Sequence, residues 1–149
     1  MNILVCIDGE PHSKCAIRRA IFLSLSLPAE LSALHVIDPW LKKFYNELYS
    51  QGRKRYLEYV DERLQVQAEQ VQKEFREMCR AEGLEAGFKA RHGEPVTEIL
   101  EEVHELNPSL LITGSKTLSA WGRFRSRNLP LRLSKQVGRQ VSMISIVEK

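Results

Sequence analysis

The sequence lacks any segment suited to crossing or entering a membrane. No apolar run approaches the roughly 18 residues that a membrane-spanning helix requires. The first residues, MNILVCIDGEP, carry no basic cluster, and Asp8 interrupts their apolar run, which excludes a secretory signal peptide. We therefore expect a cytoplasmic protein with no membrane partner.

Cysteine is scarce and scattered. Cys6, Cys15 and Cys79 form no CxxC pair and no Cys/His cluster, which excludes a disulfide framework and a zinc site. Free and mostly buried thiols are expected instead. The histidines also lack metal-ligand spacing. We interpret His12 and His92, which follow predicted strands, as polar turn residues, with contact to a ligand as the alternative.

Two common phosphate-binding motifs are missing. No GxGxxG follows the first strand, which leaves a Rossmann dinucleotide site unsupported. The run Gly-Ser-Lys-Thr at 114–117 resembles the end of a Walker A loop, but Ser109 stands where that loop needs its first glycine. Three serines in the same region have no evident base beside them: Ser115, Ser119 and Ser126. We therefore assign no catalytic residue. We expect a protein that is not an enzyme and has at most weak ATPase activity.

Acidic residues are absent between Glu105 and Glu148, although the net charge of the whole chain is only +3. This locally positive interval indicates an anion site or an interaction surface. The run Arg123–Arg127 includes Phe124 and follows Trp121, so phosphate contacts and base stacking are an alternative. Because this run is short and lies in a loop, nucleic acid is not the favoured partner.

What the chain does contain is an alternation of short apolar runs with amphipathic stretches. Ser13 is predicted to cap the first helix, Gly83 to end the second and Pro95 to start the third. An aromatic segment, Trp40–Tyr49, is interpreted as a flap at the edge of the domain, or alternatively as a ligand lid. The composition, 43% hydrophobic and 28% charged, suits one globular domain over residues 1–149. Strands are predicted at 3–7, 31–37, 84–91, 109–113 and 142–147, and helices at 13–26, 54–82, 95–106 and 130–139.

This order predicts an α/β fold, a doubly wound five-stranded parallel sheet with helices on both faces. Ligands of such sheets bind beyond the carboxyl ends of the strands, where the winding reverses. Asp8-Gly9 and Gly114-Ser115 are two such ends, so a site is predicted between them. Asp8 is equally interpreted as a turn or cap residue.

The ordered set ILVCIDGEPHSKCAIRRA, LHVID, HGEPVTEILEEV, LLITGS and VSMISIV resembles the universal stress protein family over essentially the whole chain. The resemblance implies the adenine nucleotide alpha hydrolase-like fold with strand order 3-2-1-4-5. It also implies a homodimer paired through the last strand, Ser142 to Val147, whose exposed edge suits that arrangement.

One branch of that family binds ATP through an Asp after the first strand, backbone of the second strand and a glycine motif for the phosphates. Asp8, Val36 and Gly114 match this pattern, but the remaining motif positions fall on Thr117 and Arg127-Asn128. The candidate nucleotide-binding residues are therefore Asp8, Val36, Thr113, Gly114, Lys116, Thr117, Arg127 and Asn128.

The departures change the chemistry of the phosphate cradle. Thr117 restricts the backbone, and Arg127 places a long cation where backbone N–H groups should face the phosphates. We expect a binding or regulatory module of the stress response with weak or no ATP binding. One alternative is a member that binds ATP or AMP, with Mg²⁺, and hydrolyses ATP slowly; another is an anion or nucleic-acid binder that uses the Arg123–Arg127 loop.

Overall fold

Five parallel strands form one sheet in the order β3-β2-β1-β4-β5, which confirms the predicted fold class and strand order. The computed structural model describes residues 1–38, 53–115, 129–139 and 141–147, so the Trp40–Tyr49 segment lies outside the described residues. The strands are β1 (Asn2–Cys6), β2 (Glu30–Ile37), β3 (Gly87–His92), β4 (Leu110–Ser115) and β5 (Ser142–Val147).

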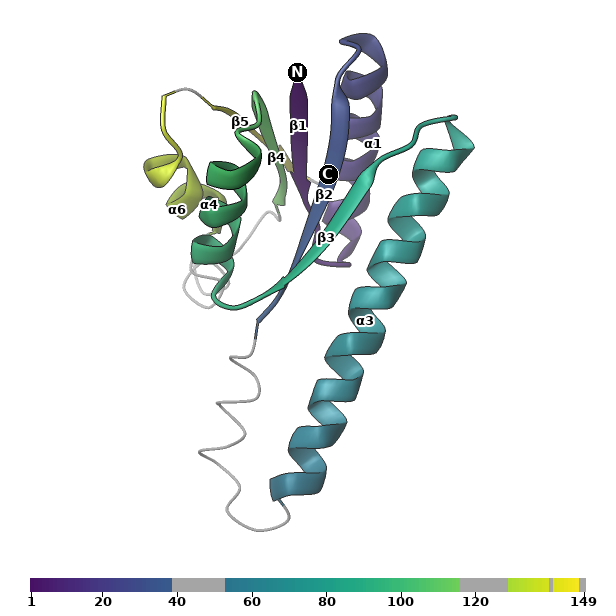
Figure 1. Cartoon of the computed structure of the whole chain (residues 1–149), viewed down its shortest axis with the longest axis vertical. Helices are drawn as coiled ribbons and strands as arrows, with labels where there is room; N and C mark the ends of the chain where they lie inside the picture. The colour runs from purple at the N-terminus through teal and green to yellow at the C-terminus, as the bar shows by residue number, and fades with distance from the viewer. Residues whose placement is uncertain (39–52, 116–128, 140, 148–149) are drawn as a thin grey trace.

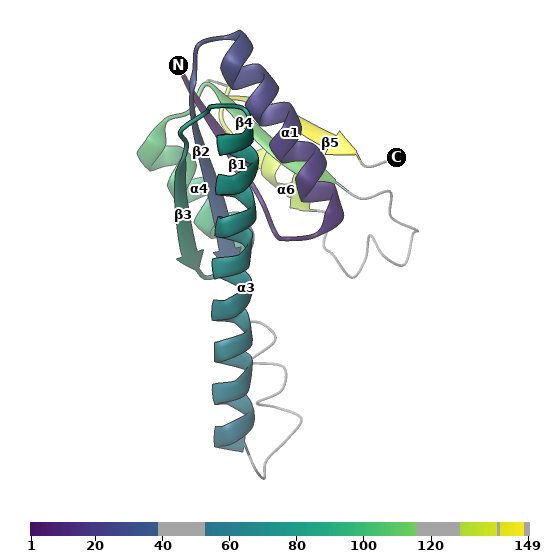
Figure 2. The same ribbon diagram turned by 90° about the vertical axis from the view of Figure 1, so that its right-hand side faces the viewer.

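Helices cover both faces of the sheet, as Figures 1 and 2 show. One face carries α1 (Pro11–Ser26) and α3 (Arg53–Ala81), and the other carries α4 (Pro95–Leu106) and α6 (Leu129–Gln136). Each face has its own core because successive strand residues point to opposite sides. Ile3, Val5 and Ile112 pack with α1 and α3, whereas Leu4 and Leu111 pack with α4 and α6.

The start of α1 differs from the prediction. The helix begins at Pro11, with Glu10 in the N-cap position and no side-chain cap bond, so the prediction that Ser13 is the cap is wrong. Proline suits the first helical position because its missing N–H would have no helical partner there. Ser13 therefore lies inside the first turn, and its hydroxyl is available to another residue.

Gly83 stops helix α3, as predicted. The helix is much longer than the strands on which it packs. Gly83 has φ of 69°, its N–H donates to Arg80 O, and Leu84 N donates to Cys79 O, which is a Schellman motif. At 1.5 Å per residue, its 29 residues span about 43 Å. Figures 1 and 2 show that its N-terminal part extends past the carboxyl ends of the strands. None of the helices that the structure describes is long and apolar enough to cross a membrane.

An ion-pair network joins edge strand β3 to α4. Arg91 donates to Glu98 Oε2 at 2.9 Å and to Glu102 Oε2 at 2.8 Å, and Lys89 also contacts Glu102, at 2.7 Å. Glu102 is only 7% exposed, so these two cations compensate a nearly buried carboxylate. The network fixes α4 against β3.

Glu94 caps α4 and makes the stability of the fold depend on pH. Burial alone would raise its pKa, but Thr97 N and Oγ1 donate to Oε2 at 2.8 and 2.9 Å and lower the pKa below the ordinary 4.5. A carboxylate with a lowered folded-state pKa stabilises the protein above its unfolded pKa and loses that contribution as pH falls.

We therefore expect Glu94→Gln to reduce the loss of unfolding free energy between neutral pH and pH values below about 4.5, the ordinary glutamate pKa. Urea unfolding at a series of pH values measures this. Glu85→Gln, which makes the same charge change at an exposed position, should keep the wild-type pH dependence. Equal pH dependence in wild type and Glu94→Gln would contradict the prediction.

Candidate functional site

The predicted site lies where β1 and β4 run side by side. Cys6 is in register with Thr113, so the loop that follows β1 and the last residues of β4 reach the same edge of the sheet. The winding of the sheet reverses between these two strands, because β2 and β3 lie on one side of β1 whereas β4 and β5 lie on the other. The structure therefore brings Asp8 and Gly114 to one edge, as predicted.

The Asp8 carboxylate is held by residues of its own loop and of α1. Oδ1 accepts from Glu10 N at 2.9 Å and from the Ser13 hydroxyl, while Oδ2 lies 2.9 Å from His12 Nε2. Ser13 Oγ in turn accepts from Asp8 N at 3.0 Å. The carboxylate thus supplies the negative charge at the N-terminus of α1 that its helix dipole favours. The side chain is still 55% exposed and can accept a further hydrogen bond.

Gly114 is required by the close approach of α1. A Cβ added at this position would lie 2.6 Å from His12 Cδ2 and 2.8 Å from the His12 carbonyl oxygen. Contacts below 3.0 Å do not occur for real Cβ atoms, so any side chain here would push α1 away from β4. The glycine that matches the family motif therefore already has a structural reason to be present.

His12 fills the space between Asp8 and Gly114. The residue is 6% exposed, which contradicts the expectation of an ordinary polar turn residue. It is buried because the first turn of α1 lies directly on β4. Its Nδ1 atom and the Oγ1 atom of Thr113, which is 2% exposed, are buried without a hydrogen-bond partner among the described residues.

The other candidates on described residues are separated from this contact. Val36 packs in the α4 and α6 core, on the opposite face from His12. On the same face as α1, His35 Nδ1 donates to Ile7 O at 2.9 Å, and Gln67 of α3 donates to Asp8 O at 3.4 Å. The β1–α1 loop is therefore held from two sides.

Four candidates from the motif comparison lie outside the described residues: Lys116, Thr117, Arg127 and Asn128. The Arg123–Arg127 loop lies there as well. The described half of the candidate site consists of Asp8, Val36, Thr113 and Gly114. To these the structure adds Ser13, which sequence reasoning missed as a site residue, and His12, for which contact with a ligand was only the alternative interpretation. Both follow Asp8 by about one helical turn.

Cys6 and Cys79 are poor nucleophiles at neutral pH. No disulfide is formed, and burial raises the pKa of Cys6 to about 12 and that of Cys79 to about 11, with the Glu102 charge adding to the effect at Cys6. All three cysteines are free, but only Cys79 is buried and Cys6 and Cys15 are half-buried, so the expectation of mostly buried thiols is met at Cys79 alone. Among the described residues, the groups at the sheet edge can accept and donate hydrogen bonds to a ligand.

Comparison with known proteins gives consistent results for sequence and fold. Residues 1–129 match the universal stress protein family. Universal stress protein YxiE of Bacillus subtilis is 28% identical over 131 residues, covering 79% of this chain and 80% of its own. Two solved structures share the fold: a universal stress protein in complex with cAMP (TM-score 0.70, 16% identity, 98% of this chain and 96% of that one), and a family member from Arabidopsis thaliana with AMP bound (TM-score 0.64, 14% identity, 100% and 92%).

Proposed function

Because the chain belongs to the universal stress protein family, we propose that it is a regulatory binding module of the stress response with weak or no ATP binding and no robust catalysis. It acts in the cytoplasm as a single domain over residues 1–149. The observation that carries the proposal is the contact of His12 with both Asp8 and Gly114. Asp8 and Gly114, two of the three family positions that this chain retains, each have a structural partner, so their presence does not require a nucleotide.

The sequence of the phosphate motif supports the same conclusion. A triphosphate needs small residues that let backbone N–H groups approach its oxygens. Thr117 and Arg127-Asn128 replace such residues here, and Arg127 would contact an anion in a different geometry. Loss of the cradle weakens binding of the phosphates more than binding of a nucleoside.

A nucleotide-binding alternative has its own support. The Asp8 carboxylate is 55% exposed, and structurally similar proteins have cAMP or AMP bound. In that alternative Asp8 accepts a hydrogen bond from the ligand, and Val36, Thr113 and Gly114 supply groups along the strand ends. Slow hydrolysis of ATP with Mg²⁺ would accompany it.

Isothermal titration calorimetry with ATP and Mg²⁺, and separately with AMP, distinguishes the two. We expect dissociation constants weaker than about 100 µM, equivalent to a binding free energy no stronger than about −5.5 kcal/mol. Micromolar affinity for ATP in the wild type that disappears in Asp8→Ala would overturn the proposal. Asp8→Asn is the matched control, because an amide oxygen can still accept from Glu10 N and Ser13 Oγ.

We further propose a homodimer paired through β5. This strand forms the edge of the sheet next to β4, and Ile144 and Val147 are 36% and 51% exposed on it. An unpaired strand edge with apolar side chains favours pairing with another strand. Substitution Ile144→Lys should weaken this dimer without disturbing the core.

A further inference from the structure

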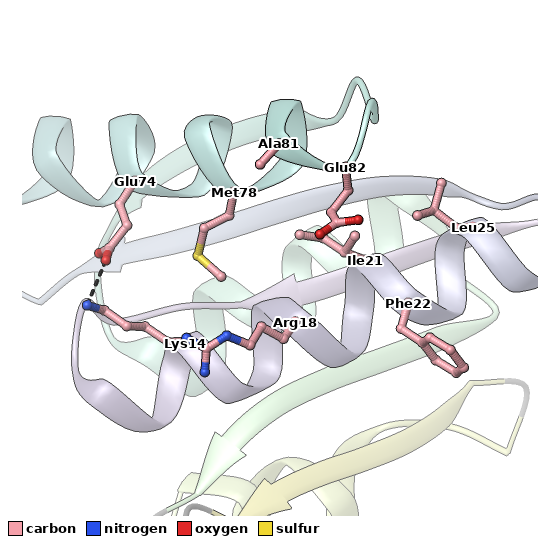
Figure 3. A pocket seen from close by; sticks show the side chains of 9 residues that line it. All are labelled: Lys14, Arg18, Ile21, Phe22, Leu25, Glu74, Met78, Ala81 and Glu82. Carbon is pink, nitrogen blue, oxygen red and sulfur yellow. Dashed lines mark ion pairs between the residues drawn. The ribbon is translucent and has the colours of Figure 1, made fainter.

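A groove runs along α1 and α3 on the face of the molecule remote from α4 and α6 (Figure 3). Its volume is about 530 Å³, which is within the usual range for binding sites. Ile21 and Met78 form part of its apolar lining, and Phe22 and Leu25 remain 59% and 50% exposed beside it. Large apolar side chains left exposed together indicate a surface that another molecule covers.

Four charged residues border the groove, and only two of them are paired. Lys14 Nζ lies 2.8 Å from Glu74 Oε1, which neutralises one end. Arg18 of α1 and Glu82, the residue after α3, have no ion-pair partner among the described residues. Figure 3 shows Arg18 toward the Lys14 end of the groove and Glu82 farther along it, next to Ile21 in this view. The surface therefore offers one free positive and one free negative charge beside an apolar lining.

We propose that this groove is an interface between two copies of the chain, related by a two-fold axis. In a two-fold interface every contact between the two copies occurs twice. Arg18 would therefore face the partner's Glu82, and Glu82 would face the partner's Arg18. The apolar residues between them, Phe22 among them, lie near the axis and contact the second copy. Both free charges are satisfied by this single arrangement.

Other occupants fit the charges less well. A lipid-like anion would pair with Arg18 but would leave Glu82 unpaired and repelling it. The second copy needs no additional molecule, because the complementary charges and the apolar side chains are on the same surface. This interface is separate from the β5 edge and does not depend on a nucleotide, so a chain that uses both surfaces forms assemblies larger than a dimer.

The test is the mass of the full chain by size-exclusion chromatography with light scattering, over a series of protein concentrations. Phe22→Asp and Arg18→Glu should each halve the mass of the wild-type assembly. The double variant Arg18→Glu with Glu82→Arg should restore it, because the swapped charges again face opposite charges across the axis. Arg19→Glu, which changes an exposed neighbouring arginine that does not line the groove, should leave the mass unchanged.

The same experiment separates this interface from the β5 dimer. Ile144→Lys should halve the mass independently, and Phe22→Asp with Ile144→Lys should give the monomer. If Phe22→Asp and Arg18→Glu keep the wild-type mass, or if the wild type is a monomer, the groove proposal is wrong. If the groove variants keep the wild-type mass while Ile144→Lys halves it, the groove proposal fails and the β5 dimer stands. Thermal unfolding followed by circular dichroism confirms that each variant is folded.

Discussion

We expect Gly114→Ala to lower the unfolding free energy by about 2 kcal/mol, the effect of overpacking at a rigid contact. The added Cβ would lie 2.6 Å from His12 Cδ2 and 2.8 Å from the His12 carbonyl oxygen. A side chain can rotate away from such a contact, but the carbonyl cannot move unless the first turn of α1 moves with it. Urea unfolding of the ligand-free protein measures the effect.

Two further variants make this prediction specific. Gly138→Ala is the matched control, because an added Cβ there meets no atom within 4 Å, and it should change stability by less than about 0.5 kcal/mol. His12→Ala combined with Gly114→Ala should recover only part of the loss, because the carbonyl contact remains. If Gly114→Ala is as stable as the wild type, then Gly114 is not required by α1, and a role in ligand binding becomes the better explanation for this glycine.

We expect Phe75→Ala to lower the unfolding free energy by about 3 to 5 kcal/mol, the usual cost of removing a fully buried aromatic side chain. Phe75 is 0% exposed and belongs to the core between the sheet and the helices α1 and α3. Its ring centroid lies 6.2 Å from that of Phe88 in β3, so the substitution also removes an aromatic pair. Alanine would leave a cavity that the packed sheet cannot close.

Val66→Ala serves as the control on the same helix. Val66 is 59% exposed, and its truncation should change stability by no more than about 0.5 kcal/mol. Chemical denaturation of both variants, with the slope of free energy against denaturant compared with the wild type, checks the prediction. A loss below about 1 kcal/mol for Phe75→Ala would mean that α3 does not hold the sheet in the way described.

Local sequence signals predicted most of the fold because they act over short distances. Pro95 and Leu106 bound α4 as predicted, and Gly83 ends α3 through the left-handed conformation that glycine favours. The helix predicted at 54–82 was interpreted as an amphipathic stretch, and Val60, Val71 and Phe75 on it are buried. Alternation of strands with helices then predicts a parallel sheet, because each helix returns the chain to the start of the next strand. The crossover connections of such a sheet have a single favoured hand, which restricts the topology further.

Local sequence signals predicted the position of the candidate site but not all of its contacts. The sequence placed Asp8 and Gly114 at strand ends near a reversal of winding, and the structure confirms that they share an edge. It did not identify Ser13 as a partner of the Asp8 carboxylate, because Pro11 moves the start of the helix two residues earlier than predicted. A hydroxyl in the first helical turn contacts the preceding loop, whereas a capping hydroxyl contacts the helix backbone.

The sequence by itself therefore determined the fold class, the strand order through the family resemblance, and the edge of the sheet where the candidate residues gather. The tertiary structure determined what those residues contact. His12 is polar and follows a strand, so nothing local distinguishes it from a turn residue, yet packing of α1 on β4 buries it between Asp8 and Gly114. Such a contact depends on how closely a helix approaches a strand more than 100 residues away along the chain, and that distance is set by the packing of the whole core.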